Sequence, residues 1–137
     1  FTFGADIIVG FPTEMDEHFS NTVELLNLCN FTNVHIFPFS PKTGTPASLM
    51  PQVKEKIKKE RVSILRKESQ RLLFAKLNKK IGKFSTILFE SNKKSYTNEY
   101  LKVKFSDEKP HKLRAGSVAN VKIVSRDEDY LIAELDK

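Results

Sequence analysis

The sequence predicts an α/β segment followed by a small all-β domain, with a long helix joining them. Three observations predict this fold class. Apolar runs with strand and helix spacing alternate in residues 1–50, a helical pattern fills most of residues 51–81, and period-two patterns occupy residues 82–137. The chain has 137 residues, of which 39% are hydrophobic and 29% are charged. This length suits one ordinary domain, or part of one domain joined to a small second one.

The first fifty residues contain a strand, a helix and a second strand. Residues 4–10, GADIIVG, are apolar between two glycines, as in a buried strand of a parallel sheet. Apolar residues then recur at helical spacing over residues 19–26, and Thr13 with Asp16 has the shape of a capping box. Residues 33–39, NVHIFPF, form the second strand. A strand–helix–strand unit makes the two strands parallel.

Both strands lead into stiff loops at their carboxyl ends, where α/β folds gather their ligands. The first loop is GFPTE, and the second holds three prolines within residues 38–46. Pro38 cannot donate a ladder hydrogen bond and therefore marks a strand end, while Gly44 permits a positive φ. A rigid polar loop at this place fits a ligand wall, although a stiff connector would have the same composition.

Residues 52–80 have the pattern of a long helix, which Gly82 ends. Its expected apolar stripe consists of Ile57, Ile64, Leu65, Leu72 and Ala75. Basic residues are expected over the remaining surface: Lys54, Lys58, Lys59, Arg61, Arg66, Lys67 and Arg71. Residues 1–50 hold one basic and five acidic residues, a net charge of −4, whereas residues 51–83 hold 12 basic and three acidic ones, a net charge of +9. This asymmetry favours a polyanion-binding surface, and the alternative is a solvated helix face.

After Gly82, short segments with period-two alternation are separated by polar turns. They cover residues 83–90, 95–105, 116–125 and 130–136. Four or five short antiparallel strands in so few residues predict a small β-barrel, because closure removes the sheet edges.

The segment 95–105 carries a candidate RNA-binding face. Period two places Tyr96, Asn98, Tyr100, Lys102 and Lys104 on one side and Thr97, Glu99, Leu101, Val103 and Phe105 on the other. Aromatic rings stack on unpaired bases and lysines contact phosphates. The alternative is ordinary strand packing, since tyrosine is a good strand former.

Other site chemistries find little support. Cys29 is the only cysteine, which excludes an internal disulfide and a CxxC metal site, and its apolar neighbours predict a buried thiol. A reducing cytoplasm fits this cysteine usage. His18, His35 and His111 are scattered without metal-ligand spacing, and no Walker loop or GxGxxG is present, so no metal or catalytic residue is assigned. No apolar run reaches the length of a membrane span.

Several motifs together resemble the C-terminal part of the radical-SAM tRNA methylthiotransferases. They are, in order, ADIIVGFPTEMDEHFSNTVELL, VHIFPFSPKTGTPASLMPQV, KKERVSILRKESQ, ILFES and SYTNEYLKVKF. The most similar branch acts on threonylcarbamoyl-adenosine beside the anticodon. The resemblance implies that residues 1–50 are the last strands of a partial (β/α) radical-SAM barrel, that 51–81 are a basic linking helix, and that 82–137 are a TRAM domain, a small OB-like β-barrel that binds tRNA.

The resemblance also implies site residues. In the methylthiotransferases that the chain resembles, the strand matching Val34–Phe39 presents its backbone to the adenine of S-adenosylmethionine. The expected cofactor-binding residues are Ile8, Gly10, Phe37, Pro38 and Phe39. The expected contacts to the tRNA anticodon stem-loop are Arg61, Arg66, Lys67, Tyr96, Thr97, Tyr100, Lys102 and Lys104. Two positions depart from the family pattern, because Thr13 stands where glycine is common and Lys42 where arginine is common.

The largest departure concerns the iron–sulfur chemistry of the family. Its 4Fe-4S clusters need a C-x-x-x-C-x-x-C motif, and Cys29 alone cannot provide these ligands. We therefore expect no methylthiolation by this chain alone. Strand-like sequence at residue 1 favours a piece of a larger enzyme, for which a separate N-terminal piece is a candidate partner. One rival is a stand-alone, non-catalytic TRAM-type RNA-binding protein from a split or decaying gene. Another is a complete small α/β enzyme of a different family.

Overall fold

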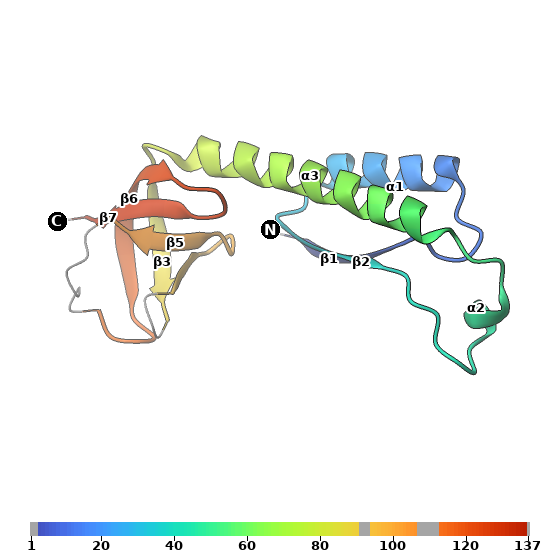
Figure 1. Cartoon of the computed structure of the whole chain (residues 1–137). Coiled ribbons are helices and arrows are strands. Elements are labelled where there is room, and N and C mark those ends of the chain that lie inside the picture. Colours follow the sequence, from blue (N-terminus) through green and yellow to red (C-terminus); the bar gives the residue numbers. More distant parts are fainter. Residues whose placement is uncertain (1–2, 91–93, 107–112, 137) are drawn as a thin grey trace. The chain divides into compact units, whose positions relative to one another are not determined.

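The structure is a computed structural model and describes residues 3–90, 94–106 and 113–136 (Figure 1). It combines helices with sheets, as predicted, and divides into two compact units. The first unit is Phe3–Leu72, and the second begins at Leu73. The longest helix, α3 (Glu55–Lys80), contributes its first part to one unit and its last part to the other. The predicted division at residues 50 and 81 stays a prediction.

The first unit is built on two parallel strands, β1 (Gly4–Val9) and β2 (Asn33–Pro38), joined through α1 (Asp16–Cys29). Their register runs from Gly4 opposite Asn33 to Val9 opposite Pro38, so the predicted strand–helix–strand unit is confirmed. Helices α1 and α3 cover one face of this sheet (Figure 1). The core of this unit joins both strands to both helices through Val9, Leu26, Ile36, Val62 and Leu65.

Two details of α1 differ from the prediction. The helix is capped at Met15 rather than Thr13, and the Met15 N–H donates to Nδ1 of His18 at 3.2 Å. Thr13 instead has a φ of 70°, which a capping residue does not adopt. Cys29 is exposed rather than buried, because the buried residues of α1 end at Leu26, one turn before the left-handed C-cap.

A loop with a short helix, α2 (Pro46–Leu49), connects β2 to α3. The buried stripe of α3 differs from the predicted one, since Ile64 is 49% exposed and Ala75 is also exposed. The stripe instead consists of Lys58, Arg61, Val62, Leu65 and Leu77. Two positions in this stripe are cations, which the sequence analysis had placed on the surface. Among the described residues, none of the helices has the length and apolar content that a membrane span requires.

The second unit is a closed five-stranded barrel. Its strands are β3 (Phe84–Phe89), β4 (Ser95–Thr97), β5 (Lys102–Phe105), β6 (Val118–Arg126) and β7 (Leu131–Leu135), in the order β3-β4-β5-β7-β6. The small predicted barrel is thus confirmed, with two corrections. The segment 95–105 is a tight hairpin rather than one strand, and β5 pairs with β7 in parallel, so the barrel is not wholly antiparallel.

The barrel encloses its own core. Its apolar side chains come from β3, β5, β6 and β7, from the residue before β5 and from the end of α3, and β4 adds the buried Ser95 and Thr97. The apolar members are Leu77, Ile87, Leu101, Val103, Val121, Ile123, Leu131 and Ala133. A register shift between Ile123 and Ser125 interrupts the pairing of β6 with β7. Such a bulge bends a strand and helps a small sheet to close. The outward-facing residues of β4 and β5 are thereby held on a rigid support.

Candidate functional site

The carboxyl ends of β1 and β2 are fastened to α3 by a buried lysine. Gly10 has a φ of 73°, and a Cβ built there would overlap Cγ of Lys58 and lie 2.8 Å from its Cδ. The Lys58 ammonium donates to the carbonyl of Phe39 at 3.2 Å and pairs with Glu55. Glycine is therefore required at position 10 both for its backbone conformation and for the space that the lysine stem fills.

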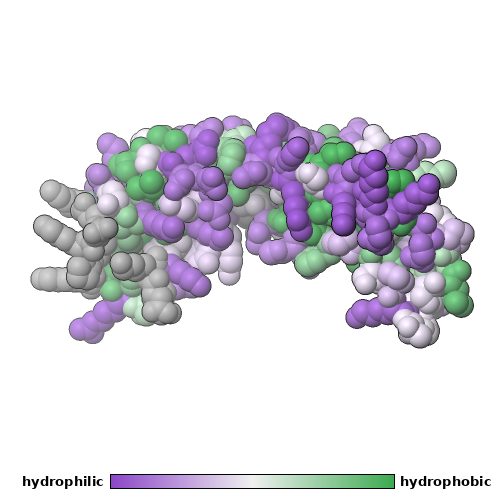
Figure 2. Space-filling view, in the orientation of Figure 1, coloured by the Kyte–Doolittle hydropathy of each residue, from purple (hydrophilic) through white to green (hydrophobic). Residues whose placement is uncertain are grey.

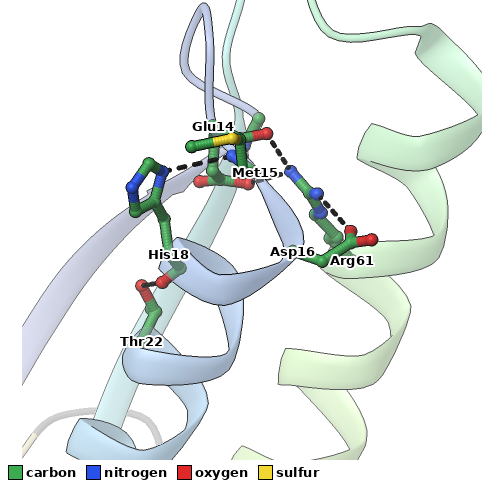
Figure 3. A network of polar contacts seen from close by, with 7 residues as sticks. Glu14, Met15, Asp16, His18, Thr22 and Arg61 are labelled. Carbon is green, nitrogen blue, oxygen red and sulfur yellow. Dashed lines mark hydrogen bonds and ion pairs between the residues drawn. The ribbon is translucent and has the colours of Figure 1, made fainter.

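An ion-pair network fixes the loop that follows β1 (Figure 3). The Arg61 guanidinium donates to the Glu14 carboxylate at 2.5 Å, to the Glu14 carbonyl at 3.0 Å and to the Asp16 carboxylate at 2.7 Å. Glu14 also accepts the N–H of Gly10 at 3.1 Å. A single arginine from α3 thus holds both the turn after β1 and the first residue of α1.

This network removes Arg61 from the expected RNA contacts. Its side chain is 6% exposed, and its guanidinium is occupied by Glu14 and Asp16. Burial by itself would lower the pKa of Arg61, but the hydrogen bonds to the two carboxylates outweigh burial and raise its pKa. The arginine is therefore a permanent cation that acts inside the fold. No local pattern in the sequence indicated this role, because the two carboxylates lie 47 and 45 residues away along the chain.

The sheet face that the helices leave uncovered carries two of the expected cofactor residues. Ile8 and Phe37 are partners in the parallel register and are 58% and 51% exposed. Asp6 and His35, one step earlier on the same face, are also partners and exposed. This face therefore offers an apolar pair next to a polar pair at the carboxyl ends of the strands.

The other expected cofactor residues surround the same strand ends. Gly10 is buried, Pro38 is exposed and Phe39 is half-buried. The Phe39 N–H donates to the Val9 carbonyl at 2.8 Å. Within the described residues β2 pairs with β1 alone, so its second edge has peptide groups with no strand beside them.

A basic groove lies between the end of β2 and α3. It has a volume of about 390 Å³ and is lined by Pro38, Lys59, Val62, Ser63, Arg66, Lys67 and Gln70. Of these, Arg66 and Lys67 are expected RNA contacts, and both side chains are exposed. Figure 2 shows hydrophilic side chains gathered along the visible side of α3. The structure thus brings one expected cofactor residue and two expected RNA contacts to a single groove.

The hairpin of β4 and β5 groups the other expected RNA contacts on the outside of the barrel. Tyr96 is opposite Lys102 in the register, and the rings of Tyr96 and Tyr100 are 5.6 Å apart. Tyr100 is 73% exposed and has a φ of 62°. Lys102 and Lys104 are exposed on β5. We call Tyr96, Tyr100, Lys102 and Lys104 the tyrosine–lysine surface.

Thr97, the remaining expected contact, has a different position. It is 4% exposed, and its hydroxyl accepts the N–H groups of Glu99 and Leu101, each at 3.2 Å. A threonine hydroxyl that accepts nearby backbone donors stabilises a turn. Thr97 therefore closes the hairpin, and we no longer assign it to RNA contact.

Two residues that the sequence analysis did not select complete the tyrosine–lysine surface. Asp129, in the turn between β6 and β7, accepts from the Lys102 ammonium at 3.1 Å. The Lys104 ammonium is 3.6 Å from the ring centroid of Tyr130, whose hydroxyl donates to Asp127 at 2.5 Å. No local pattern indicated these contacts, because the turn follows β5 by more than twenty residues.

The chain is similar in sequence to known tRNA methylthiotransferases. The chain is 38% identical over 130 residues to the threonylcarbamoyladenosine tRNA methylthiotransferase of Rickettsia prowazekii, a match that covers 95% of this chain and 30% of that protein. It is 36% identical over 139 residues to the protein of the same name from Thermotoga maritima, with 97% of this chain and 31% of that protein covered. No family model matches.

A relative with a different substrate in its name has a comparable identity over a shorter stretch of the chain. The tRNA-2-methylthio-N(6)-dimethylallyladenosine synthase of Ehrlichia canis is 39% identical over 100 residues, which cover 72% of this chain and 23% of that protein. The chain is homologous to the tRNA methylthiotransferases. The resemblance stated from its motifs is therefore confirmed. This homologue spans about 30% of the length of the first relatives, and its substrate branch stays a prediction.

The described residues of this methylthiotransferase homologue do not fit an iron–sulfur cluster. Cys29 is the only cysteine and is exposed at the end of α1. Nowhere in residues 3–90, 94–106 and 113–136 do three histidine, cysteine, aspartate or glutamate side chains gather as metal ligands. Cluster ligation needs several thiolates. We therefore derive no reaction step from these residues through a cluster.

Proposed function

We propose that this chain supplies the tRNA grip and one part of the S-adenosylmethionine pocket of a tRNA methylthiotransferase. The reaction would add a methylthio group to a modified adenosine next to the anticodon. The observation that carries the proposal is the identity of 36–39% with methylthiotransferases over most of the chain. The whole reaction requires cluster ligands from a further part of such an enzyme, either on the same polypeptide or on a separate N-terminal piece.

Exposure and charge support tRNA binding by the barrel. The tyrosine–lysine surface combines two neighbouring aromatic rings with two ammonium groups on one hairpin. Exposed rings on a small barrel provide stacking platforms for unpaired bases, and lysines beside them contact the phosphates. Arg66 and Lys67 on α3 would add further phosphate contacts, because both side chains are exposed.

The strand ends of the first unit support cofactor binding. Ile8 and Phe37 form an exposed apolar pair, and the second edge of β2 offers backbone groups beside it. An adenine ring has apolar faces and a hydrogen-bonding edge, so such a place suits it. Lys58 and Arg61 would act indirectly, since they hold Phe39 and the loop from Gly10 to Asp16 in place. Groups that are ordered before the cofactor arrives lower the ordering cost of binding.

Binding of an anticodon stem-loop RNA tests the tRNA part of the proposal. Fluorescence anisotropy with a labelled 17-nucleotide stem-loop should give an affinity that falls steeply with salt. With four or five phosphate contacts, the affinity should drop by roughly a hundredfold between 50 and 200 mM salt. Tyr100→Ala should weaken binding by roughly tenfold through lost stacking.

The matched control is Lys122→Gln on the barrel and uses an exposed lysine of β6 outside the tyrosine–lysine surface. It should change the affinity less than Lys104→Gln does. An affinity that does not depend on salt, or equal effects of the two lysine substitutions, would remove this assignment.

A stand-alone RNA-binding protein is the alternative function. It would bind RNA in the same assay and would not bind S-adenosylmethionine under any pairing of chains. The threonylcarbamoyladenosine tRNA methylthiotransferases of Rickettsia prowazekii and Thermotoga maritima match across the α/β segment and the barrel together, at 95% and 97% of this chain. That coverage does not favour the alternative. Mixing the chain with an N-terminal piece that carries the cluster, and measuring cofactor cleavage, distinguishes the two.

A further inference from the structure

The β6–β7 turn places an acidic side chain against one of the two cations of the tyrosine–lysine surface. Asp129 accepts from Lys102 at 3.1 Å, and both side chains are about half exposed. A pocket of about 370 Å³ opens at this place between β4, β5 and the turn. Tyr96 and Tyr130 contribute aromatic walls, and Lys94, Lys102 and Lys104 contribute positive charge.

The pocket suits a single unpaired nucleotide better than a duplex. Its volume is near the lower end of the range for small-ligand pockets, roughly 300–1,000 Å³. Aromatic walls accept the face of one base, and ammonium groups at the rim accept a phosphate. Base-paired RNA keeps its bases stacked and inaccessible, so it would meet only the lysines.

The ion pair with Asp129 then has a consequence for binding. A phosphate that approaches Lys102 must replace the carboxylate that already neutralises it. An exposed ion pair is weak, so this replacement is feasible at modest cost. Lys104 differs, because its ammonium contacts the uncharged Tyr130 ring and the Asp127 carboxylate acts on it only electrostatically, at longer range.

We infer that this pocket takes one unpaired nucleotide of RNA, and that Asp129 sets the affinity by competing with the phosphate for Lys102. This inference rests on the proposed function, because the ligand is the same RNA. It adds a residue that restrains binding. Asp129 reduces the weak, non-selective attraction of Lys102 to any polyanion. A nucleotide that also stacks in the pocket gains enough interaction to displace the Asp129 carboxylate.

The test compares charge-matched variants of the full chain. Asp129→Asn removes the competing charge, and Glu128→Gln removes an equal charge from the exposed neighbouring residue of the same turn. Each is titrated with the labelled anticodon stem-loop and with a fully paired RNA hairpin of equal length. Asp129→Asn should tighten stem-loop binding by roughly threefold to fivefold, a factor consistent with releasing one exposed ion pair.

Lys102→Gln identifies the group through which Asp129 acts. In the Lys102→Gln background, Asp129→Asn should have no more effect than Glu128→Gln. Lys102→Gln alone should reduce the slope of log affinity against log salt by roughly 0.7–0.9, the value for one lost phosphate contact. Asp129→Asn should also raise the affinity for the paired hairpin relatively more than that for the stem-loop, because the restraint on non-selective binding is gone.

Two outcomes overturn the inference in distinguishable ways. If the unsubstituted chain binds the stem-loop with steep salt dependence but Asp129→Asn behaves like Glu128→Gln, the role of Asp129 is refuted and tRNA binding stands. If neither the chain nor any variant binds either RNA, the proposed tRNA binding itself fails, and this inference fails with it.

Discussion

Replacement of Arg61 by methionine should destabilise the first unit. The guanidinium is 6% exposed and makes three hydrogen bonds to the loop after β1. Methionine preserves a flexible apolar stem against the Phe19 ring, which is 5.4 Å from the guanidinium carbon. The substitution therefore removes mainly the ionic contacts.

The size of the effect follows from the burial of the two carboxylates. Removal of one partner of a buried pair commonly costs about 3–5 kcal/mol, because the other charge stays buried and unpaired. Here the Glu14 side chain is only 12% exposed but keeps the N–H of Gly10, and the Asp16 side chain is fully exposed. The exposed partner adds little. We therefore expect a loss of about 2–3 kcal/mol in the free energy of unfolding.

Urea unfolding followed by circular dichroism at 222 nm measures this loss. With a slope of about 1.5 kcal/mol per molar urea, the midpoint should fall by about 1.3–2 M. Hydrogen exchange supplies a local measurement, since the Gly10 amide donates to the carboxylate that Arg61 anchors. Its exchange should accelerate in Arg61→Met.

Arg66→Met is the matched control, because Arg66 is exposed on the same helix. It should change the unfolding free energy by less than about 0.5 kcal/mol. Equal effects of the two substitutions on the urea midpoint, or an unchanged Gly10 exchange rate in Arg61→Met, would refute the structural role of Arg61. A double-mutant cycle with Glu14→Gln should give a coupling energy above about 1 kcal/mol.

Three further predictions use backbone strain and one pKa shift. Gly10→Ala should lower the free energy of unfolding by about 3 kcal/mol, because residue 10 has a φ of 73° and the new methyl group would overlap the buried Lys58 side chain. Gly44→Ala should lower it by only about 1 kcal/mol, because residue 44 has a φ of 85° but open space around it. Equal losses in thermal or urea unfolding would contradict this. Thr13→Gly should stabilise the chain by about 0.5–1 kcal/mol, since a β-branched residue at a φ of 70° is strained, and a lower melting temperature would argue against that strain. The hydrogen bond from Tyr130, followed by a backbone N–H, lowers the pKa of Asp127 below its ordinary 3.8. The stabilisation is therefore present above about pH 4 and is lost as the pH falls through the folded pKa. The stability difference between the unsubstituted chain and Asp127→Asn should accordingly shrink in acid, and a difference independent of pH would exclude this contribution.

Period-two alternation predicts the outward-facing residues of the segment 95–105 correctly, although it predicts one strand where the structure has a hairpin. Tyr96 and Lys102 lie on the same side of the sheet in the predicted strand and in the observed hairpin, because they are cross-strand partners in the hairpin. The turn was missed because it contains no glycine, and Tyr100 adopts the left-handed conformation instead. The hydroxyl of Thr97 supplies the hydrogen bonds that such a turn needs.

Helical spacing was less informative for α3. It indicates which residues share a side of the helix, but not which side is buried when charged residues occupy several sides. Lys58 and Arg61 are buried because distant segments supply their partners, Phe39 at the end of β2 for Lys58 and Glu14 in the loop after β1 for Arg61. Those partners are 19 and 47 residues away in sequence. Cys29 was misassigned for a related reason, since its apolar neighbour Leu28 is itself 74% exposed.

The sequence by itself determined the order of the elements, the parallel pair of strands, the small barrel and the family resemblance. These depend on local periodicity and on motifs that are contiguous in the chain. Only the tertiary structure decided which cations are available to a ligand, because availability depends on the carboxylates that distant segments bring to each of them. Arg61 is held inside the fold by Glu14 and Asp16. Lys102 stays about half exposed although it pairs with Asp129, and Arg66 and Lys67 are exposed beside a groove.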